Sequence, residues 1–291
     1  MKTPILSIIT VNFNNNEGLK KTLRSIETQS YTSYEHIIID ADSNDGSKET
    51  IEKYSERNTR LTYWVSEKDN GIYDGMNKGI RQAKGEYLYF LNSGDCLQGD
   101  ILKKISFDGT KYIYGDMVLI NNQEQRKETG PDYPDLIFFF YNALAHQACF
   151  IHHSLFADKL YDTRYKIIAD WGHSFQSIIM EGCSYRHIPS TIAECDGTGI
   201  SSNYIDVQTE RLKWLKENLS HQLYSTYIDI LEYNKSEFKA IIPTMNHTKK
   251  FQKRARKLVC WLLKLNAIFS SHHTPAEDIY NSILYRPFSN K

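Results

Sequence analysis

The sequence predicts an α/β fold in which a mostly parallel β-sheet carries helices on both faces. Two observations in the first third of the chain lead to this prediction. Short apolar runs typical of buried strands alternate there with segments whose apolar residues recur at helical spacing. Such strand–helix–strand units place their strands parallel and their helices on the sheet faces. With 291 residues, 41% of them hydrophobic, the chain can form one large domain and an appendage.

Each early element has a local pattern of its own. Strands are predicted for residues 6–11, 36–40, 61–65 and 87–91. Leu19, Leu23 and Ile26 mark a helix after the first strand, because they recur at helical spacing. Asp45 or Ser47 is placed to cap the helix that follows the second strand.

The segment 66–95 is the most informative part of the chain. Its apolar residues between 72 and 83 repeat at helical spacing, and Gly85 is placed to end that helix. The predicted strand 87–91 follows and leads into a small polar loop, residues 92–95, with the sequence Asn-Ser-Gly-Asp. Open α/β sheets bind ligands beyond the carboxyl ends of their strands, so we expect chemistry at this loop.

The rest of the chain contains two further kinds of segment. Strands are predicted for residues 111–120, 147–151 and 185–188, and helices for residues 135–142 and 169–180. From about residue 206 the pattern becomes helical and basic. We therefore predict a domain of residues 1–205 and a helical C-terminal region of residues 206–291.

Composition excludes several classes of function. Lysine plus arginine equals aspartate plus glutamate at 35 each, so overall charge predicts no nucleic-acid partner. Five cysteines without a Cys-x-x-Cys pair argue against a zinc ribbon or a disulfide framework. No Gly-x-Gly-x-x-Gly, P-loop or Gly-x-Ser-x-Gly motif occurs. With no signal peptide and no apolar run of membrane-spanning length, a cytoplasmic protein is expected.

A basic segment near the C-terminus, residues 248–270, differs from the rest. Lysines and arginines between 249 and 257 precede the apolar run 258–263, which contains Trp261. This pattern is typical of an amphipathic helix lying on an anionic membrane surface. The alternatives are an ordinary helix packed on the main domain and a contact between two copies of the chain.

Several short motifs in residues 5–95, in their order and spacing, resemble the family-2 glycosyltransferases. The motifs are SIITVNFN at 7–14, IID at 38–40, SNDGS at 43–47, DNGIYD at 69–74, MNKG at 76–79 and LNSGD at 91–95. The closest similarity is to bacterial enzymes that build capsule, exopolysaccharide or O-antigen repeats. The resemblance implies the GT-A fold, with residues 1–95 as the nucleotide-binding half and 96–205 as the acceptor half.

The same resemblance implies a reaction. A sugar would move from a nucleotide-sugar donor, with UDP expected, to a saccharide or polyprenyl-linked acceptor, with inversion at the anomeric carbon. A segment such as 248–270 would then hold the enzyme at the inner face of the membrane. Two alternatives are a sugar-phosphate nucleotidyltransferase, although its glycine-rich phosphate loop is missing here, and a non-catalytic relative that binds a nucleotide.

Stabilisation of the departing diphosphate commonly needs a divalent cation, and Mg²⁺ or Mn²⁺ prefers oxygen ligands. Asp95 is the predicted metal ligand. This chain departs from the acidic pattern of the family, because Asn92 and Gly94 stand at two of its positions. Asn92 is instead expected to contact the ribose or a metal-bound water.

Deprotonation of the acceptor needs a base, and Asp170 is the predicted one. The resemblance supports it, and the alternative is an N-cap of the helix it begins. Trp171 is predicted to flank the acceptor or simply to pack, and His146 is a secondary candidate for the site.

Nucleotide-sugar contacts are expected at the ends of the first strands and at the loop after the fourth. The predicted residues are Val11, Asn12, Asp40, Asp69, Asn77, Asn92, Ser93 and Gly94. Asp40 is expected to accept a hydrogen bond from the base, although it and Asp69 could simply end strands. Asn77 is predicted on the polar side of its helix. Asp116 follows a later strand and is a candidate for a sugar contact.

Overall fold

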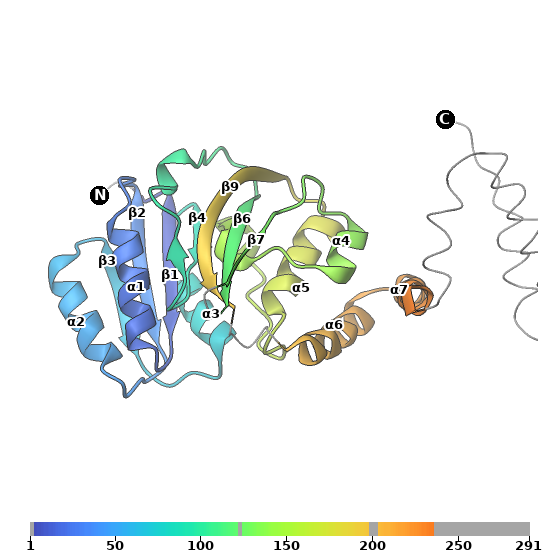
Figure 1. Cartoon of the computed structure of the whole chain (residues 1–291), viewed down its shortest axis with the longest axis horizontal. Helices are drawn as coiled ribbons and strands as arrows, with labels where there is room; N and C mark the ends of the chain where they lie inside the picture. The colour runs from blue at the N-terminus through green and yellow to red at the C-terminus, as the bar shows by residue number, and fades with distance from the viewer. Residues whose placement is uncertain (1–2, 122–123, 198–202, 236–291) are drawn as a thin grey trace, which may run out of the picture. The chain divides into compact units, whose positions relative to one another are not determined.

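The computed structural model describes residues 3–121, 124–197 and 203–235 (Figure 1). The chain divides into two compact units, residues 1–218 and 219–291. The predicted membrane segment, residues 248–270, lies outside the described residues. Within the second unit, one helix is described, α7 (His221–Lys235). All that follows concerns the first unit.

The first third of the chain alternates strictly between strand and helix. Its elements are β1 (Leu6–Asn12), α1 (Asn16–Glu27), β2 (Tyr34–Asp40), α2 (Ser47–Arg57), β3 (Leu61–Ser66), α3 (Ile72–Gln82) and β4 (Tyr87–Phe90). All of these elements were predicted, with ends that differ by a few residues. Gly46, rather than Asp45 or Ser47, occupies the N-cap of α2. The Asp45 carboxylate accepts hydrogen bonds from the backbone N–H and the hydroxyl of Ser47.

The later part of the unit is less regular. Its strands are β5 (Cys96–Leu97), β6 (Tyr112–Asn121), β7 (Glu124–Glu128), β8 (Cys149–His152) and β9 (Tyr185–Asp196). Its helices are α4 (Leu136–Tyr141), α5 (Ala169–Phe175) and α6 (Tyr204–Asn218). Short 3₁₀ turns cover Leu102–Lys104, His146–Ala148 and His153–Phe156, and a π-helical turn, Gln176–Met180, continues α5.

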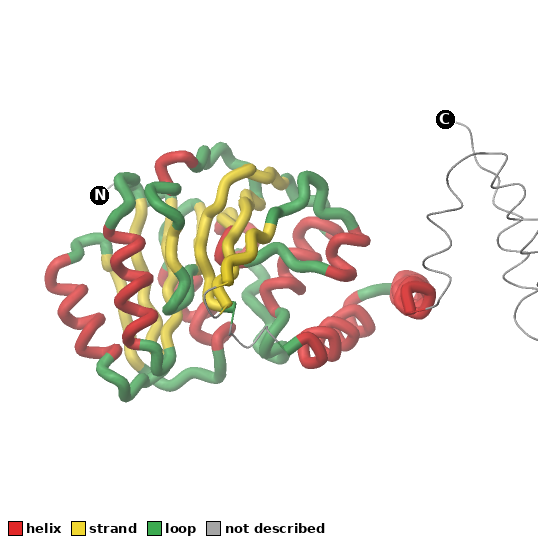
Figure 2. Tube along the Cα trace, in the orientation of Figure 1, coloured by secondary structure: helices red, strands yellow, loops and turns green. Residues whose placement is uncertain are grey.

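One mixed sheet runs through the unit in the order β3-β2-β1-β4-β8-β6-β9-β5, with β7 beside β6 (Figure 2). The strands β3, β2, β1 and β4 are parallel, as are β6 and β9. The remaining pairs are antiparallel, with β8 joining β4 to β6. The prediction of a mostly parallel α/β sheet is therefore confirmed.

Helices cover both faces of the parallel strands. On one face, α1 and α2 bury Leu19 and Tyr54 with Ile38 of β2 in one apolar cluster. On the other face α3 approaches β1 closely, since a Cβ added at Gly79 would lie 2.5 Å from the Ile9 side chain. Alternate residues of a strand point to opposite faces, which explains why Ile38 and Ile9, on adjacent strands, contact different helices.

Strand β9 is longer than the sequence predicts. The predicted strand covers residues 185–188 and is followed by Pro189, which cannot donate a hydrogen bond to a neighbouring strand. The structure continues the strand to Asp196 by shifting its register against β6 near Gly115 and Asp116. The added length lets β9 pair with β5 directly after the loop 92–95, with Cys96 opposite Glu194.

Helix α6 belongs to the first unit and packs on α5. Trp214 is buried against Trp171, with ring centroids 5.3 Å apart. Gly172 makes room for this contact, because an added Cβ would lie 2.6 Å from Trp214 Nε1. The Glu210 carboxylate accepts backbone hydrogen bonds from Lys166 and Ile167, which lead into α5. Through α5, α6 therefore supports the region around Asp170.

Candidate active site

The carboxyl ends of β1, β2 and β3 meet at Asp40. This side chain is fully buried and accepts hydrogen bonds from Asn12 Nδ2 at 2.6 Å and Ser66 Oγ at 2.6 Å. The backbone N–H and the hydroxyl of Ser43 donate to it as well, at 3.0 and 2.6 Å. Asp40 thus ends its strand and also ties three strand ends together. The other amide atom, Asn12 Oδ1, is buried without a hydrogen-bond partner among the described residues.

Val11 and Asp69 lie beside this cluster. A Cβ added at Gly75 would come within 3.1 Å of Asp69 Oδ2 and 3.3 Å of Val11 Cγ1, so α3 approaches both. The Asp69 carboxylate accepts a hydrogen bond from Gly71 N at 2.9 Å. Burial raises the pKa of Asp69, with the backbone bond and Lys78 acting in the opposite direction. The predicted residues Val11, Asn12, Asp40 and Asp69 are thereby brought together.

The loop after β4 is held in place by β1 and α1. Ser93 N donates to Val11 O, and Asn15 Nδ2 donates to Ser93 O. The Thr22 hydroxyl lies 2.7 Å from Asp95 O and accepts from Gly94 N at 3.0 Å. Gly94 has φ +106°, a conformation that favours glycine. This backbone requirement is a physical reason for glycine where the family pattern has an acidic residue.

Asp95 is a buried carboxylate whose charge is only partly compensated by its neighbours. Asp95 is only 6% exposed, and its Oδ2 accepts a hydrogen bond from Gln147 Nε2 at 3.2 Å. Burial raises the pKa of Asp95 to about 6, although hydrogen bonds from Gln147, the Asp196 backbone and Cys195 act to lower it. Near neutral pH the carboxylate therefore carries a charge that a bound cation would stabilise.

Asp170 is held by side chains from two other elements. Its Oδ1 lies 2.6 Å from the Tyr73 hydroxyl of α3, and its Oδ2 lies 3.0 Å from His146 Nδ1. Burial raises the pKa of Asp170, but the hydrogen bonds from His146 and Tyr73 outweigh it, so the net pKa lies below the usual value. Burial and the Asp170 charge raise the pKa of Tyr73 well above its usual value, which keeps it a donor.

The helix cap proposed as the alternative role of Asp170 does not match the geometry. Ile168 occupies the N-cap position of α5, without a side-chain cap bond. Asp170 lies within the first turn, and its carboxylate meets Tyr73 and His146. The side chain retains 17% of its exposure, which leaves it accessible from one side.

His146 joins the two parts of the site. Its Nδ1 meets Asp170, and its Nε2 lies 3.0 Å from Asn92 Nδ2. The next residue, Gln147, reaches Asp95. The 3₁₀ turn His146–Ala148 therefore places one residue against each carboxylate.

Three predicted contacts are placed elsewhere. Asn77 was predicted on the polar side of its helix, but it is only 3% exposed. Its side-chain Nδ2 donates a hydrogen bond to Tyr161 O, and its Oδ1 accepts one from Tyr161 N. Asp116 is buried against Lys127 and His187. Trp171 packs on α6 and donates from Nε1 to the carbonyls of Phe139 and Asn142. Among the described residues, these three side chains form their hydrogen bonds with partners other than Asp95 and Asp170.

Sequence reasoning missed two residues of the site, Tyr73 and Thr22, and named Gln147 beside His146 without giving it a role. Tyr73 lies beside the apolar stripe of its helix, where an aromatic residue indicates only core packing. Its contact with Asp170 spans 97 residues of chain, so no local pattern contains it. Gln147 and Thr22 likewise reach the loop 92–95 from distant segments.

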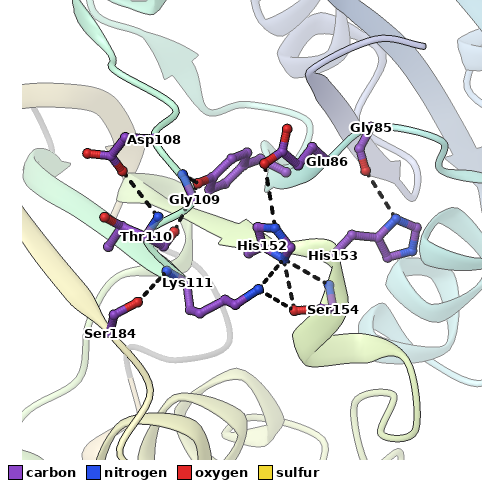
Figure 3. A network of polar contacts seen from close by, with 11 residues as sticks. Gly85, Glu86, Asp108, Gly109, Thr110, Lys111, His152, His153, Ser154 and Ser184 are labelled. Atoms are coloured by element: carbon purple, nitrogen blue, oxygen red, sulfur yellow. Dashed lines mark hydrogen bonds and ion pairs between the residues drawn. The ribbon is translucent and has the colours of Figure 1, made fainter.

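A second polar cluster occupies the opposite end of β4, around residue Glu86 (Figure 3). His152 Nδ1 lies 3.1 Å from Lys111 Nζ, and His152 Nε2 lies 3.6 Å from Glu86 Oε1. Ser154 Oγ accepts from Lys111 Nζ at 2.9 Å. This cluster joins β6 and β8 to the start of β4, whereas Asp95 follows the other end of that strand.

The described residues contain no group of three or more histidine, cysteine or acidic side chains that could hold a metal by itself. Asp95 fits a hard cation as a single buried carboxylate whose charge lacks a full counter-charge. Further oxygen ligands would have to come from a bound diphosphate and water, as is usual for Mg²⁺.

Comparison with known proteins identifies the family. The model described as "Glycosyl transferase family 2" matches residues 7–162, more than half of the chain. The chain belongs to this family. An uncharacterized glycosyltransferase of Mycobacterium tuberculosis is 32% identical over 213 residues, which cover 69% of this chain and 78% of the relative. A PGL/p-HBAD biosynthesis glycosyltransferase of Mycobacterium bovis is 28% identical over 74% of this chain and 85% of its own.

Solved structures show the same fold at low sequence identity. S. aureus TarS 1–349 in complex with UDP-GlcNAc has a TM-score of 0.59 and 16% identity, covering 85% of this chain and 77% of that one. The chain spans 46% of the longer TarS structure. The mannosyltransferase PcManGT from Pyrobaculum calidifontis, in complex with GDP-Man and Mn²⁺, has a TM-score of 0.55 and 15% identity, covering 98% and 82%.

The protein is thus a glycosyltransferase with the predicted GT-A fold. Among the helices that the structure describes, none combines the length and the apolar character needed to cross a bilayer.

Proposed function

We propose that this glycosyltransferase moves a sugar from a UDP-sugar to a hydroxyl of a saccharide or polyprenyl-linked acceptor in surface polysaccharide biosynthesis. The observation that carries the proposal is the pair of carboxylates, Asp95 and Asp170, linked through the turn His146–Ala148 at the carboxyl end of the sheet. Their surroundings shift the two pKa values in opposite directions. Carboxylates with different protonation behaviour are suited to different roles in one reaction.

The donor nucleotide would lie over the ends of β1 and β2. Asn12 Oδ1, buried and without a partner among the described residues, can accept a hydrogen bond from an N–H of the base. Asp40 accepts a hydrogen bond from Asn12 Nδ2 and so orients the Asn12 amide. Asp40, predicted to bind the base itself, would then support the contact of Asn12 with the base. Val11 and Asp69 complete the wall, and the UDP-GlcNAc complex of TarS makes a UDP-sugar the first donor class to test.

The diphosphate would lie at the loop formed by Asn92, Ser93, Gly94 and Asp95. Asp95 would hold Mg²⁺ or Mn²⁺, which supplies positive charge to the departing diphosphate when bound. The chain itself positions that ligand: Gln147 orients the carboxylate, and Thr22 holds the loop backbone. Metal binding is included in the proposal because the PcManGT structure contains Mn²⁺ with its donor.

Asp170 would act as the base. In one displacement, the acceptor oxygen bonds to the anomeric carbon, the bond to the diphosphate breaks, and the hydroxyl proton passes to Asp170. A single displacement inverts the configuration at that carbon. A pKa below the usual value keeps the carboxylate ionised at neutral pH, and Tyr73 and His146 fix its orientation. An acceptor on a lipid carrier would place the reaction at the cytoplasmic face of a membrane.

The proposal is tested first by ligand binding. The purified protein is heated with UDP, GDP, dTDP or CDP, each with and without Mn²⁺. A diphosphate at about a hundred times its dissociation constant adds about 2.7 kcal/mol of stability. We expect a shift with UDP that increases with Mn²⁺, followed by release of UDP from the matching sugar nucleotide when acceptor is present. No shift with any diphosphate, together with no turnover, would favour a non-catalytic relative. Release of pyrophosphate instead would indicate a nucleotidyltransferase.

A further inference from the structure

Three side chains form a continuous hydrogen-bonded chain between the loop after β4 and the base. Asn92 Nδ2 lies 3.0 Å from His146 Nε2, and His146 Nδ1 lies 3.0 Å from Asp170 Oδ2. His146 is 15% exposed and Asp170 is 17% exposed, so both contacts are largely shielded from water. Such contacts between shielded polar groups are stronger than the same contacts in water.

If His146 is neutral, the donor and the acceptor in each of these two hydrogen bonds are fixed by the chemistry of the three groups. An ionised carboxylate only accepts, so His146 must carry its proton on Nδ1. The other ring nitrogen of a neutral imidazole is then an acceptor, and the Asn92 amide must donate to it. This orientation leaves Asn92 Oδ1 facing away from the ring, and that atom has no hydrogen-bond partner among the described residues.

An aspartate at position 92 would change this arrangement. A carboxylate there could only accept, so a bond to Nε2 would require a proton on both ring nitrogens. His146 would then be an imidazolium between two carboxylates. A full positive charge beside Asp170 would favour its ionised form further and weaken it as a base. The amide at position 92 avoids this charge.

We propose that His146 is a positioning residue for the base Asp170, and that Asn92, at a position where the family pattern is acidic, holds His146 as the neutral Nδ1–H tautomer. The inference rests on the proposed function, because it assigns His146 a part in the same reaction. It gives His146, predicted only as a secondary candidate for the site, the role of supporting Asp170. It also gives Asn92 a role that does not depend on contact with ribose or metal.

Two conservative variants separate the ring nitrogens. In His146→Asn the side-chain amide nitrogen takes roughly the place of Nδ1 and can still donate to Asp170. In His146→Gln it takes roughly the place of Nε2, so the donor to Asp170 is lost. We expect His146→Gln to lower kcat about tenfold to hundredfold and His146→Asn to lower it less than about fivefold. Asn92→Asp should lower kcat about tenfold through the imidazolium.

The readouts distinguish positioning from a structural role. UDP affinity, measured by calorimetry, should stay within about threefold of wild type in the two His146 variants, so their loss is in kcat alone. The matched control is His152→Gln, which removes a histidine of the cluster in Figure 3, at the far end of β4. Its kcat should stay within about twofold of wild type. Equal kcat values for the two His146 variants, or a kcat of His146→Gln near wild type, would overturn the inference.

A spectroscopic measurement on the full chain does not depend on turnover. Nitrogen-15 shifts of the His146 ring distinguish the two neutral tautomers and the imidazolium. We expect the Nδ1–H tautomer at pH 7.5 in wild type and the imidazolium in Asn92→Asp. The Nε2–H tautomer in wild type would overturn the inference whether or not the enzyme turns over. Lack of turnover by wild type, with the expected tautomer, would instead count against the proposed function alone.

Discussion

The strand ends of β1–β3 and the loop after β4 each contain a buried carboxylate, and the two carboxylates differ in how fully their surroundings compensate them. Asp40, fully buried, accepts hydrogen bonds from three neighbouring side chains and one backbone N–H. Asp95, also buried, accepts from Gln147 at 3.2 Å, and burial raises its pKa to about 6. Asp40 is satisfied within the protein, whereas Asp95 holds charge that the protein compensates incompletely.

This difference indicates a structural role for Asp40 and a ligand-binding role for Asp95. A satisfied carboxylate can tie strand ends together with no ligand present, which suits a scaffold for the nucleotide. A poorly compensated one costs folding free energy that a bound cation would offset. The predictions below test that separation, beginning with the largest expected effect.

Replacing the base should have the largest effect. Asp170→Asn keeps the shape of the side chain but removes the proton acceptor, so we expect transfer to fall about 10²- to 10⁴-fold. The affinity for UDP with Mn²⁺ should remain near wild type, because the proposed role of Asp170 is a contact with the acceptor and not with UDP. Steady-state kinetics and calorimetry provide the two measurements. Transfer at a near-normal rate would remove Asp170 from the role of base.

Removing Asp40 should mainly destabilise the fold. Asp40→Ala leaves Asn12, Ser43 and Ser66 with buried donors and no acceptor, which should lower the free energy of unfolding by about 3–5 kcal/mol. Urea unfolding measures the loss. Asp40→Asn, which keeps one acceptor oxygen, is the matched control and should lose less. A loss below about 1 kcal/mol in Asp40→Ala would contradict the assignment of Asp40 to the scaffold.

Removing the charge of Asp95 should stabilise the fold near neutral pH, whereas removing Asp40 should destabilise it. The pKa of Asp95 is about 6 when folded and about 3.9 when unfolded, so the folded state binds its proton more tightly. The stability that this provides is fully present below pH 4 and is lost as pH rises through 6. Asp95→Asn lacks the titration. The free energy of unfolding of the variant, relative to that of wild type, should therefore rise by about 2 kcal/mol between pH 4 and pH 8.

The gain in Asp95→Asn should come with a loss of function. Without the carboxylate, Mn²⁺ should no longer strengthen the binding of UDP. Urea unfolding at several pH values and calorimetry with and without Mn²⁺ test the two parts. If the stability difference between the variant and wild type does not change with pH, Asp95 is compensated within the folded protein and the comparison with Asp40 fails.

A smaller effect is expected at the turn of the loop. Gly94→Ala places a side chain at φ +106° with its Cβ 3.2 Å from Asn15 Nδ2. We expect a loss of about 1–2 kcal/mol in unfolding free energy and a weaker response of UDP binding to Mn²⁺, because the loop must shift. Gly99→Ala, also at positive φ but with open space around it, is the control for the backbone strain alone. Equal metal responses in the two variants would show that the loop geometry is not needed.

The regular part of the fold could be predicted because its signals are local. Residues 6–91 alternate short apolar runs with stripes of period 3.6, and every predicted strand and helix there is confirmed. The later strands β5 and β7 were missed, since Cys96–Leu97 is very short and Glu124–Glu128 is charged throughout. Strand β9 was predicted only for residues 185–188, and its continuation depends on a register shift against β6 that the sequence of β9 alone does not reveal.

The site was predictable where strand ends determine it. Asn12, Asp40 and Asp95 follow strands whose parallel arrangement brings their carboxyl ends to one edge of the sheet. Asn77 was predicted to contact the nucleotide-sugar, and Trp171 either to flank the acceptor or simply to pack. The structure uses Asn77 to bind the main chain of Tyr161, and Trp171 to pack on α6. Neither partner is close in sequence, so spacing alone does not reveal them.

The sequence by itself determined the fold class, the family and the strand ends where the polar residues gather, because these follow from periodicity and from motifs read along the chain. The tertiary structure decided what each polar residue contacts. Tyr73, His146 and Asp170 come from three separate segments, and Gln147 reaches Asp95 across 52 residues of chain. Burial and hydrogen bonding set the protonation of a carboxylate, and both depend on neighbours that only folding brings together.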